Sequence, residues 1–181
     1  MVERLVIVSD MWGTKKGQWI TSYLGYLQQY FEIIFYDSQE LANINLTVET
    51  EETLHQEFVN SGIETAVAHV LKRESIPSHY LAFSTGGTII YKAGLQGLPV
   101  KSLYAISPTR VRMEKEKPVF PFKLLFGSND AFKPSKEWSD RLGISWSEAS
   151  GYGHDLYSDE KIIKQVCSEL LDKVIKKQFQ N

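Results

Sequence analysis

The chain has 181 residues, of which 43% are hydrophobic and 23% charged, and its formal net charge is −2. These values exclude a disordered or fibrous chain, and the slight negative charge argues against a large surface for nucleic acid. The single cysteine excludes an intramolecular disulfide and a cysteine-rich zinc site. The first apolar run is too short for a secretory signal, and no stretch approaches the ~18 apolar residues of a membrane span. We therefore expect one cytoplasmic domain over residues 1–181.

Short apolar runs recur along the chain, and they lack the alternation of apolar and polar residues that a half-exposed strand shows. This pattern is typical of strands buried on both faces of a parallel sheet. A sixth, more polar run is expected at an edge of the sheet. In chain order the six runs cover residues 5–8, 33–36, 80–83, 103–106, 124–126 and 144–148.

The segments between these runs carry apolar residues at helical spacing, most clearly over residues 19–27, 63–71 and 158–177. Ser61 and Glu64 form a capping-box pattern for the second of these helices. Alternation of strands and helices predicts an α/β fold: a single-domain, doubly wound, mostly parallel sheet of about six strands with helices on both faces.

Ser84 follows the third predicted strand, at the point where a helix begins. The residues two positions before and after it are small, Ala82 and Gly86. A sharp strand-to-helix turn that exposes a nucleophilic serine has this requirement, because larger side chains would collide across the turn. The alternative is a serine that only caps the helix.

Two other polar residues follow predicted strands in the second half of the chain. Asp130 comes after the strand at 124–126, and His154 lies in a glycine-flanked loop before the last helix. Parallel strands end at the same edge of a sheet, where open α/β sheets build their sites. Ser84, Asp130 and His154 are therefore expected at one edge, in the chain order nucleophile, acid, base.

With these motifs the chain resembles the α/β-hydrolase superfamily, as a minimal member. The resemblance implies that Ser84 attacks an acyl carbonyl, that His154 takes and returns the proton, and that Asp130 orients the imidazole. It implies a serine hydrolase that acts on a small acyl substrate, a carboxylic ester or thioester, without a metal or other cofactor. The segment 107–121, where the family often inserts a lid, is too short for a helical one.

The resemblance also implies two backbone N–H groups that stabilise the oxyanion of the tetrahedral intermediate. One belongs to Thr85, and the other comes from the loop after the first strand, where either Met11 or Trp12 is the donor. Asp10 in that loop would disfavour a developing anion unless its carboxylate points away. Four aromatic residues are candidates for the walls of an open substrate pocket: Trp12, Phe83, Phe132 and Tyr152.

Two other functions are compatible with the sequence. The same fold can serve as a non-catalytic binding protein, and the imperfect match of the serine turn and the oxyanion loop to the family pattern keeps this alternative open. A nucleotide-binding domain could use residues 84–88 as a phosphate loop, but neither glycine-rich nucleotide-binding pattern is present.

Overall fold

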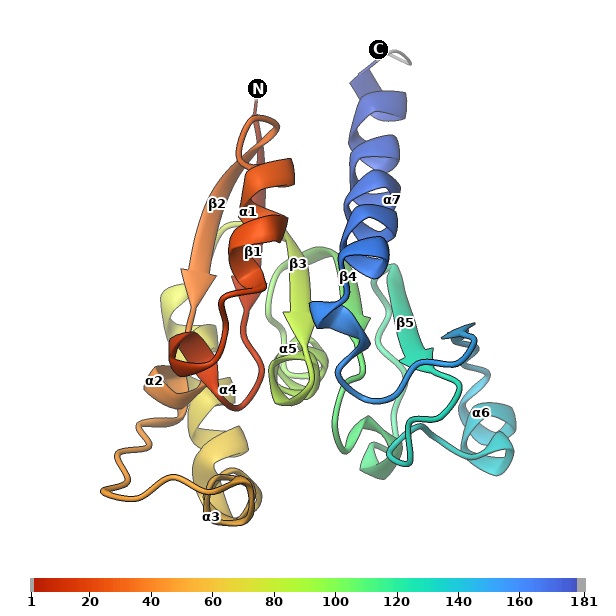
Figure 1. Ribbon diagram of the computed structural model, residues 1–181. Coiled ribbons are helices and arrows are strands. Elements are labelled where there is room, and N and C mark those ends of the chain that lie inside the picture. The colour runs from red at the N-terminus through yellow and green to blue at the C-terminus, as the bar shows by residue number, and fades with distance from the viewer. Residues whose placement is uncertain (1, 179–181) are drawn as a thin grey trace.

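The computed structural model describes residues 2–178, which form one sheet of six parallel strands with helices on both faces (Figure 1). The strands lie in the order β2-β1-β3-β4-β5-β6. This arrangement confirms the predicted doubly wound sheet and the edge position of the last strand. The strands are β1 (Glu3–Val8), β2 (Phe31–Tyr36), β3 (Ser78–Phe83), β4 (Val100–Ile106), β5 (Phe122–Gly127) and β6 (Ser147–Ala149).

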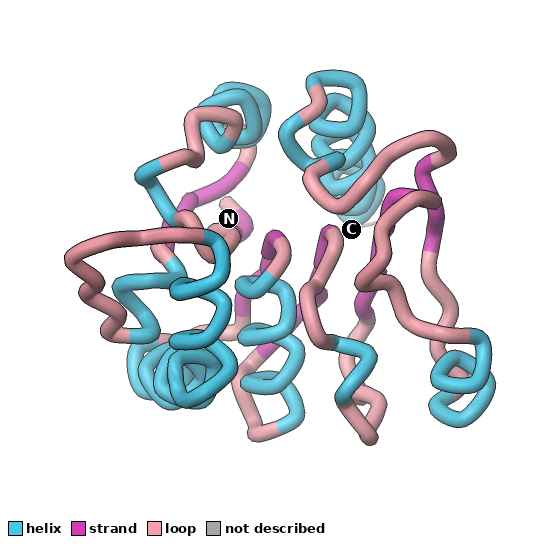
Figure 2. Tube along the Cα trace, turned by 60° about the horizontal axis from the view of Figure 1, so that its bottom comes forward, coloured by secondary structure: helices cyan, strands magenta, loops and turns pink. Residues whose placement is uncertain are grey.

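The helices cover the sheet from two sides. Helices α1 and α7 contact each other on one face, and the remaining helices lie on the other (Figure 2). Figure 2 looks toward the edge at which the strands end. The helices are α1 (Ile20–Leu27), α2 (Ser38–Ala42), α3 (Glu51–Glu57), α4 (Ile63–Arg73), α5 (Thr85–Leu95), α6 (Lys136–Leu142) and α7 (Glu160–Gln178).

Strand β3 shows why the apolar runs lack alternation. Tyr80 and Ala82 point into the apolar cluster beneath α4 and α5, whereas Leu81 and Phe83 point into the cluster beneath α1 and α7. All four side chains have no exposed surface. Because both faces of the strand are covered, both sets of alternating residues must be apolar.

Three local expectations are corrected by the structure. The last strand begins at Ser147 instead of residue 144, because Ile144 is buried in the helix-covered cluster. The expected cap at Ser61 does not form, since a π-helical turn over Phe58–Gly62 joins α3 to α4. Helix α7 begins at Glu160, after a 3-10 turn, and Asp159 accepts the backbone N–H groups of its first residues.

The segment between β4 and β5 holds one short 3-10 turn, Val111–Met113, and no longer helix. The sequence predicted that this segment is too short for a helical lid, and the structure has no such lid between β4 and β5. Over residues 2–178, no helix is both long enough and apolar enough to cross a membrane.

Candidate active site

Ser84 occupies the sharp turn between β3 and α5. Its backbone has φ 50° and ψ −121°, a conformation that few residues other than glycine adopt. The turn requires a small residue at position 86, because a Cβ on Gly86 would lie 2.2 Å from the carbonyl oxygen of Ser9. The packing of β1 against the start of α5 thus fixes where the Ser84 side chain emerges.

The loops after β3, β5 and β6 bring Ser84, Asp130 and His154 together at the edge where the strands end, the lower edge in Figure 1. Ser84 Oγ lies 2.9 Å from His154 Nε2, and His154 Nδ1 lies 2.9 Å from Asp130 Oδ2. An ionised carboxylate can only accept hydrogen bonds, so Nδ1 donates to Asp130. This leaves Nε2 of the neutral imidazole as an acceptor directed at the Ser84 hydroxyl.

The Asp130 side chain is fully buried, while that of His154 is 29% exposed. Burial of Asp130 favours its neutral form, but hydrogen bonds from His154 and from the Phe132 N–H outweigh burial. The pKa of the Asp130 carboxyl therefore lies below its ordinary value. The group stays ionised beside the imidazole at neutral pH.

A close approach of two loops joins Asp130 to His154. A Cβ on Gly127, at the end of β5, would lie 2.2 Å from the carbonyl oxygen of Tyr152. The Asn129 N–H donates to that same oxygen at 2.9 Å. The glycine at the end of β5 thus allows the loop that carries His154 to lie directly against the turn that carries Asp130.

The loop after β1 lies beside Ser84. The Trp12 N–H donates to Asp10 Oδ1 at 3.1 Å, and the Gln39 amide donates to the Met11 carbonyl oxygen at 2.9 Å. Among residues 2–178, the structure gives the Met11 N–H no acceptor. Thr85 is the first residue of α5, where a helix leaves its N–H groups without intrahelical partners. Met11 and Thr85, rather than Trp12, have N–H groups available for an anion.

Both carboxylate oxygens of Asp10 accept hydrogen bonds from neighbouring groups. Its Oδ2 accepts from the Tyr157 hydroxyl at 3.1 Å, and its Oδ1 accepts from Trp12. Burial raises the pKa of the Asp10 carboxyl to about 6, and the hydrogen bonds from Tyr157 and Trp12 partly oppose this shift. Asp10 thus shapes the loop that presents Met11.

Sequence reasoning missed Thr109. Its Oγ1 lies 2.7 Å from Ser84 Oγ and 3.3 Å from His154 Nε2, and the residue is buried. No spacing pattern marks this threonine. Its position just beyond the end of β4, at the same edge of the sheet, is the signal that could have identified it.

A cavity of about 430 Å³ opens at Ser84 and His154. Of the four predicted wall residues only Phe132 lines it. Phe83 is fully buried and packs against Trp19 and Tyr157 as part of the core. The other two predicted wall residues do not line the cavity: Lys16 lies over the Trp12 ring, and the Tyr152 hydroxyl donates to Asp159.

Helix α3 supplies the wall that sequence analysis did not foresee. Glu51, Glu52 and His55 line the cavity together with Met11, Thr85 and Thr109. Both glutamates are solvent-exposed, and no ion pair involves them among residues 2–178. The part of the cavity wall that α3 forms therefore carries two negative charges.

Comparison with known proteins gives likeness at the level of structure. No family model and no curated protein sequence matches this chain. One similar structure, from Xanthomonas campestris pv. campestris, is provisionally described as a hydrolase of the alpha/beta superfamily. It has a TM-score of 0.67 and 14% identity, and the match covers 94% of this chain and 99% of that one.

Two further solved structures are also similar. Naproxen esterase from Bacillus subtilis has a TM-score of 0.62 and 12% identity, covering 96% of this chain and 84% of its own. Est1E from Butyrivibrio proteoclasticus has a TM-score of 0.61 and 13% identity, covering 96% and 89%. At these identities the likeness establishes the fold: this chain has the α/β-hydrolase fold, in a small form without a lid.

Proposed function

We propose that this protein is a serine hydrolase that cleaves a carboxylic ester or thioester through an acyl-enzyme. The observation that carries the proposal is the continuous relay from Ser84 through His154 to the buried Asp130, with both contacts at 2.9 Å. Naproxen esterase, which has the same fold, supports this class of reaction.

In the first half of the reaction, Ser84 Oγ attacks the acyl carbonyl carbon while its proton passes to His154 Nε2. The N–H groups of Met11 and Thr85 donate to the oxyanion that forms. The carbon–oxygen or carbon–sulfur bond to the leaving group then breaks, and His154 returns the proton to the departing alcohol or thiol. The acyl group remains as an ester of Ser84.

In the second half, a water molecule gives its proton to His154 and attacks the acyl carbon. Breakage of the bond to Ser84 Oγ, with return of the proton, releases the carboxylic acid and restores the serine. Throughout both halves Asp130 remains ionised and holds the imidazole in the tautomer that accepts at Nε2.

The direct test compares hydrolysis of short-chain chromogenic esters and thioesters by the wild type, Ser84→Ala and His154→Ala. We expect the wild type to turn over at least one of them and Ser84→Ala to lower kcat by around 10⁶. Ser168→Ala, at an exposed serine in the middle of α7 and outside the cavity, is the matched control and should keep full activity. A wild type inert to all of these substrates would instead favour the non-catalytic binding protein, whereas an active Ser84→Ala would show that Ser84 is not the nucleophile.

A further inference from the structure

Thr109 places a second hydroxyl at the nucleophile. Its Oγ1 is 2.7 Å from Ser84 Oγ, which is closer than the 2.9 Å between Ser84 Oγ and His154 Nε2. Thr109 is 8% exposed, and its backbone N–H donates to the Ser84 carbonyl oxygen at 3.2 Å. Both the side chain and the backbone of this threonine are thus fixed relative to Ser84.

The direction of these hydrogen bonds follows from counting donors. Neutral His154 has one acceptor, Nε2, so it can accept a hydrogen bond from Ser84 or from Thr109 but not from both. Ser84 Oγ is 2.9 Å away and Thr109 Oγ1 is 3.3 Å away, so the shorter and stronger bond comes from Ser84. Thr109 then donates to Ser84 Oγ, and all three groups are satisfied.

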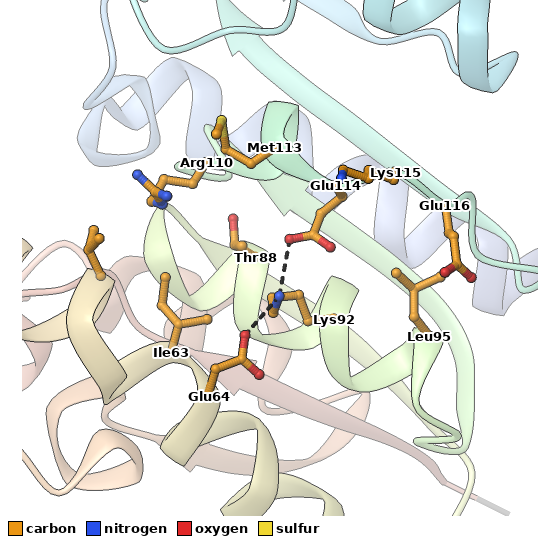
Figure 3. A pocket seen from close by; sticks show the side chains of 11 residues that line it. Ile63, Glu64, Thr88, Lys92, Leu95, Arg110, Met113, Glu114, Lys115 and Glu116 are labelled. Atoms are coloured by element: carbon orange, nitrogen blue, oxygen red, sulfur yellow. Dashed lines mark hydrogen bonds and ion pairs between the residues drawn. The ribbon is translucent and has the colours of Figure 1, made fainter.

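The segment that carries Thr109 is fastened to α5, the helix that begins at the Ser84 turn. The Thr88 hydroxyl donates to the Thr109 carbonyl oxygen, and the Tyr91 hydroxyl donates to the Glu116 carbonyl oxygen at 2.7 Å. Lys92 contacts Glu114 at 3.4 Å, as Figure 3 shows beside Thr88. These contacts, from successive turns of α5, hold the segment in place.

A close backbone approach completes this attachment. A Cβ on Gly87 would lie 2.9 Å from the Cβ of Pro108, so only glycine leaves room for the segment against α5. The hollow of about 380 Å³ beneath the segment, lined by Thr88, Lys92 and Arg110 (Figure 3), contains as many acidic as basic side chains and favours no one class of ligand.

We propose that Thr109 is a positioning residue that donates to Ser84 Oγ and so directs the serine proton at His154. The inference rests on the proposed function, since it assigns a role in the same nucleophilic step. With the Thr109 hydroxyl absent, the Ser84 hydroxyl rotates about its Cβ–Oγ bond with one fewer partner to fix it. The reactive orientation is then populated less, although a side chain of the same size at position 109 keeps the shape of the cavity wall.

The test replaces the hydroxyl without changing the size of the side chain. We compare three variants: Thr109→Val, Thr109→Ser and the control Thr21→Val, which changes an exposed threonine of α1. The measurements are the rate of reaction with a fluorophosphonate, and kcat and KM for an ester that the wild type hydrolyses. Thr109→Val is expected to lower the fluorophosphonate rate and kcat by roughly tenfold, with KM within about twofold, because one hydrogen bond to the nucleophile is lost. Thr109→Ser should restore both rates.

The outcomes separate this inference from the function on which it rests. A wild type that reacts normally while Thr109→Val reacts equally fast would overturn the role of Thr109 alone. Equal impairment of Thr109→Ser and Thr109→Val would also overturn it, since the hydroxyl would then not be the cause. Failure of the wild type itself to react would overturn the proposed function and this inference together. Thermal unfolding of each variant shows whether a lost rate comes from a lost fold. If Thr109→Val is unfolded, Thr109→Ser provides the test: a rate near that of the wild type is expected, and a lowered rate would overturn the inference.

Discussion

The Asp130–His154 pair shows how a single buried charge sets the chemistry of its neighbour. The carboxylate is fully buried yet keeps a pKa below its ordinary value, because its acceptors are filled by His154 and by the Phe132 N–H. An amide of the same shape would fill the same space. It would not require Nδ1 of His154 to be the protonated nitrogen.

If the proposed function holds, Asp130→Asn is expected to leave the fold intact and to lower kcat by about 10⁴, the effect that the wrong imidazole tautomer has in a Ser-His-Asp protease. The measurement is ester hydrolysis together with thermal unfolding of the same preparation. Near-normal turnover by a folded Asp130→Asn would mean that another group orients His154.

Asp10 presents the opposite case, a carboxyl whose burial dominates. Its pKa of about 6 in the folded protein lies above the ~3.9 of an unfolded aspartate. The folded state therefore binds more protons between these values, and the free energy of unfolding falls as the pH rises from about 4 to about 6. The destabilisation caused by burying the ionised Asp10 carboxylate is fully present above pH 6 and absent below pH 4.

Asp10→Asn should remove this pH dependence. Relative to the wild type, the variant is expected to gain on the order of 1–3 kcal/mol of unfolding free energy between pH 4 and pH 8. Urea unfolding at pH 4, 6 and 8 measures the difference, and Asp172→Asn at an exposed site is the control. If the difference in unfolding free energy between Asp10→Asn and the wild type stays constant with pH, whatever its sign, the raised pKa of Asp10 is contradicted.

At the scale of elements, the site depends on two close approaches between a strand end and a loop. Gly86 lets β1 pack against the start of α5, and Gly127 lets the His154 loop lie against the end of β5. In both cases the two atoms nearest to an added Cβ belong to backbone, which cannot move without shifting a whole element.

Gly127→Ala should accordingly displace the His154 loop from Asp130. We expect a loss of unfolding free energy of about 1–3 kcal/mol and a loss of hydrolysis larger than the fraction unfolded explains. Gly25→Ala is the matched control, because its new Cβ would meet nothing within 4 Å on the surface of α1. The control should be neutral or more stable by up to about 1 kcal/mol. Full activity in Gly127→Ala would show that this contact does not position His154.

The elements explain which residues the sequence could identify. The strands were predictable because burial on both faces leaves a continuous apolar run, and parallel strands that end at one edge bring Ser84, Asp130 and His154 together. Thr109 lies at that edge as well, but no motif surrounds it, and its approach to Ser84 depends on Gly87 packing against Pro108. The α3 wall was unpredictable for a related reason: the path of residues 43–50 determines where Glu51 and Glu52 lie, and that path leaves no periodic pattern.

At the scale of the whole molecule, we expect charge around the open cavity to influence which esters reach Ser84. Glu51 and Glu52 lie at its rim, and without a helical lid the charges face solvent. At physiological ionic strength they act over a Debye length of about 8 Å. Anionic esters should be repelled relative to neutral or cationic ones.

The double variant Glu51→Gln, Glu52→Gln should raise kcat/KM for an anionic ester by several-fold and leave a neutral ester of the same size unchanged. High salt should produce the same effect in the wild type by screening the two charges. Glu137→Gln, at the start of α6 and outside the cavity, is the control. An unchanged preference would show that the α3 wall does not select substrates.

The claim on which all of these expectations depend is that Ser84 is the activated nucleophile of the protein. Mass spectrometry after incubation with a fluorophosphonate measures this directly, because only a serine made nucleophilic by its surroundings forms the adduct rapidly. We expect one adduct per chain, on the peptide that contains Ser84, with none in Ser84→Ala and very slow formation in His154→Ala. A folded wild type that forms no adduct, or forms it on another residue, would contradict the claim.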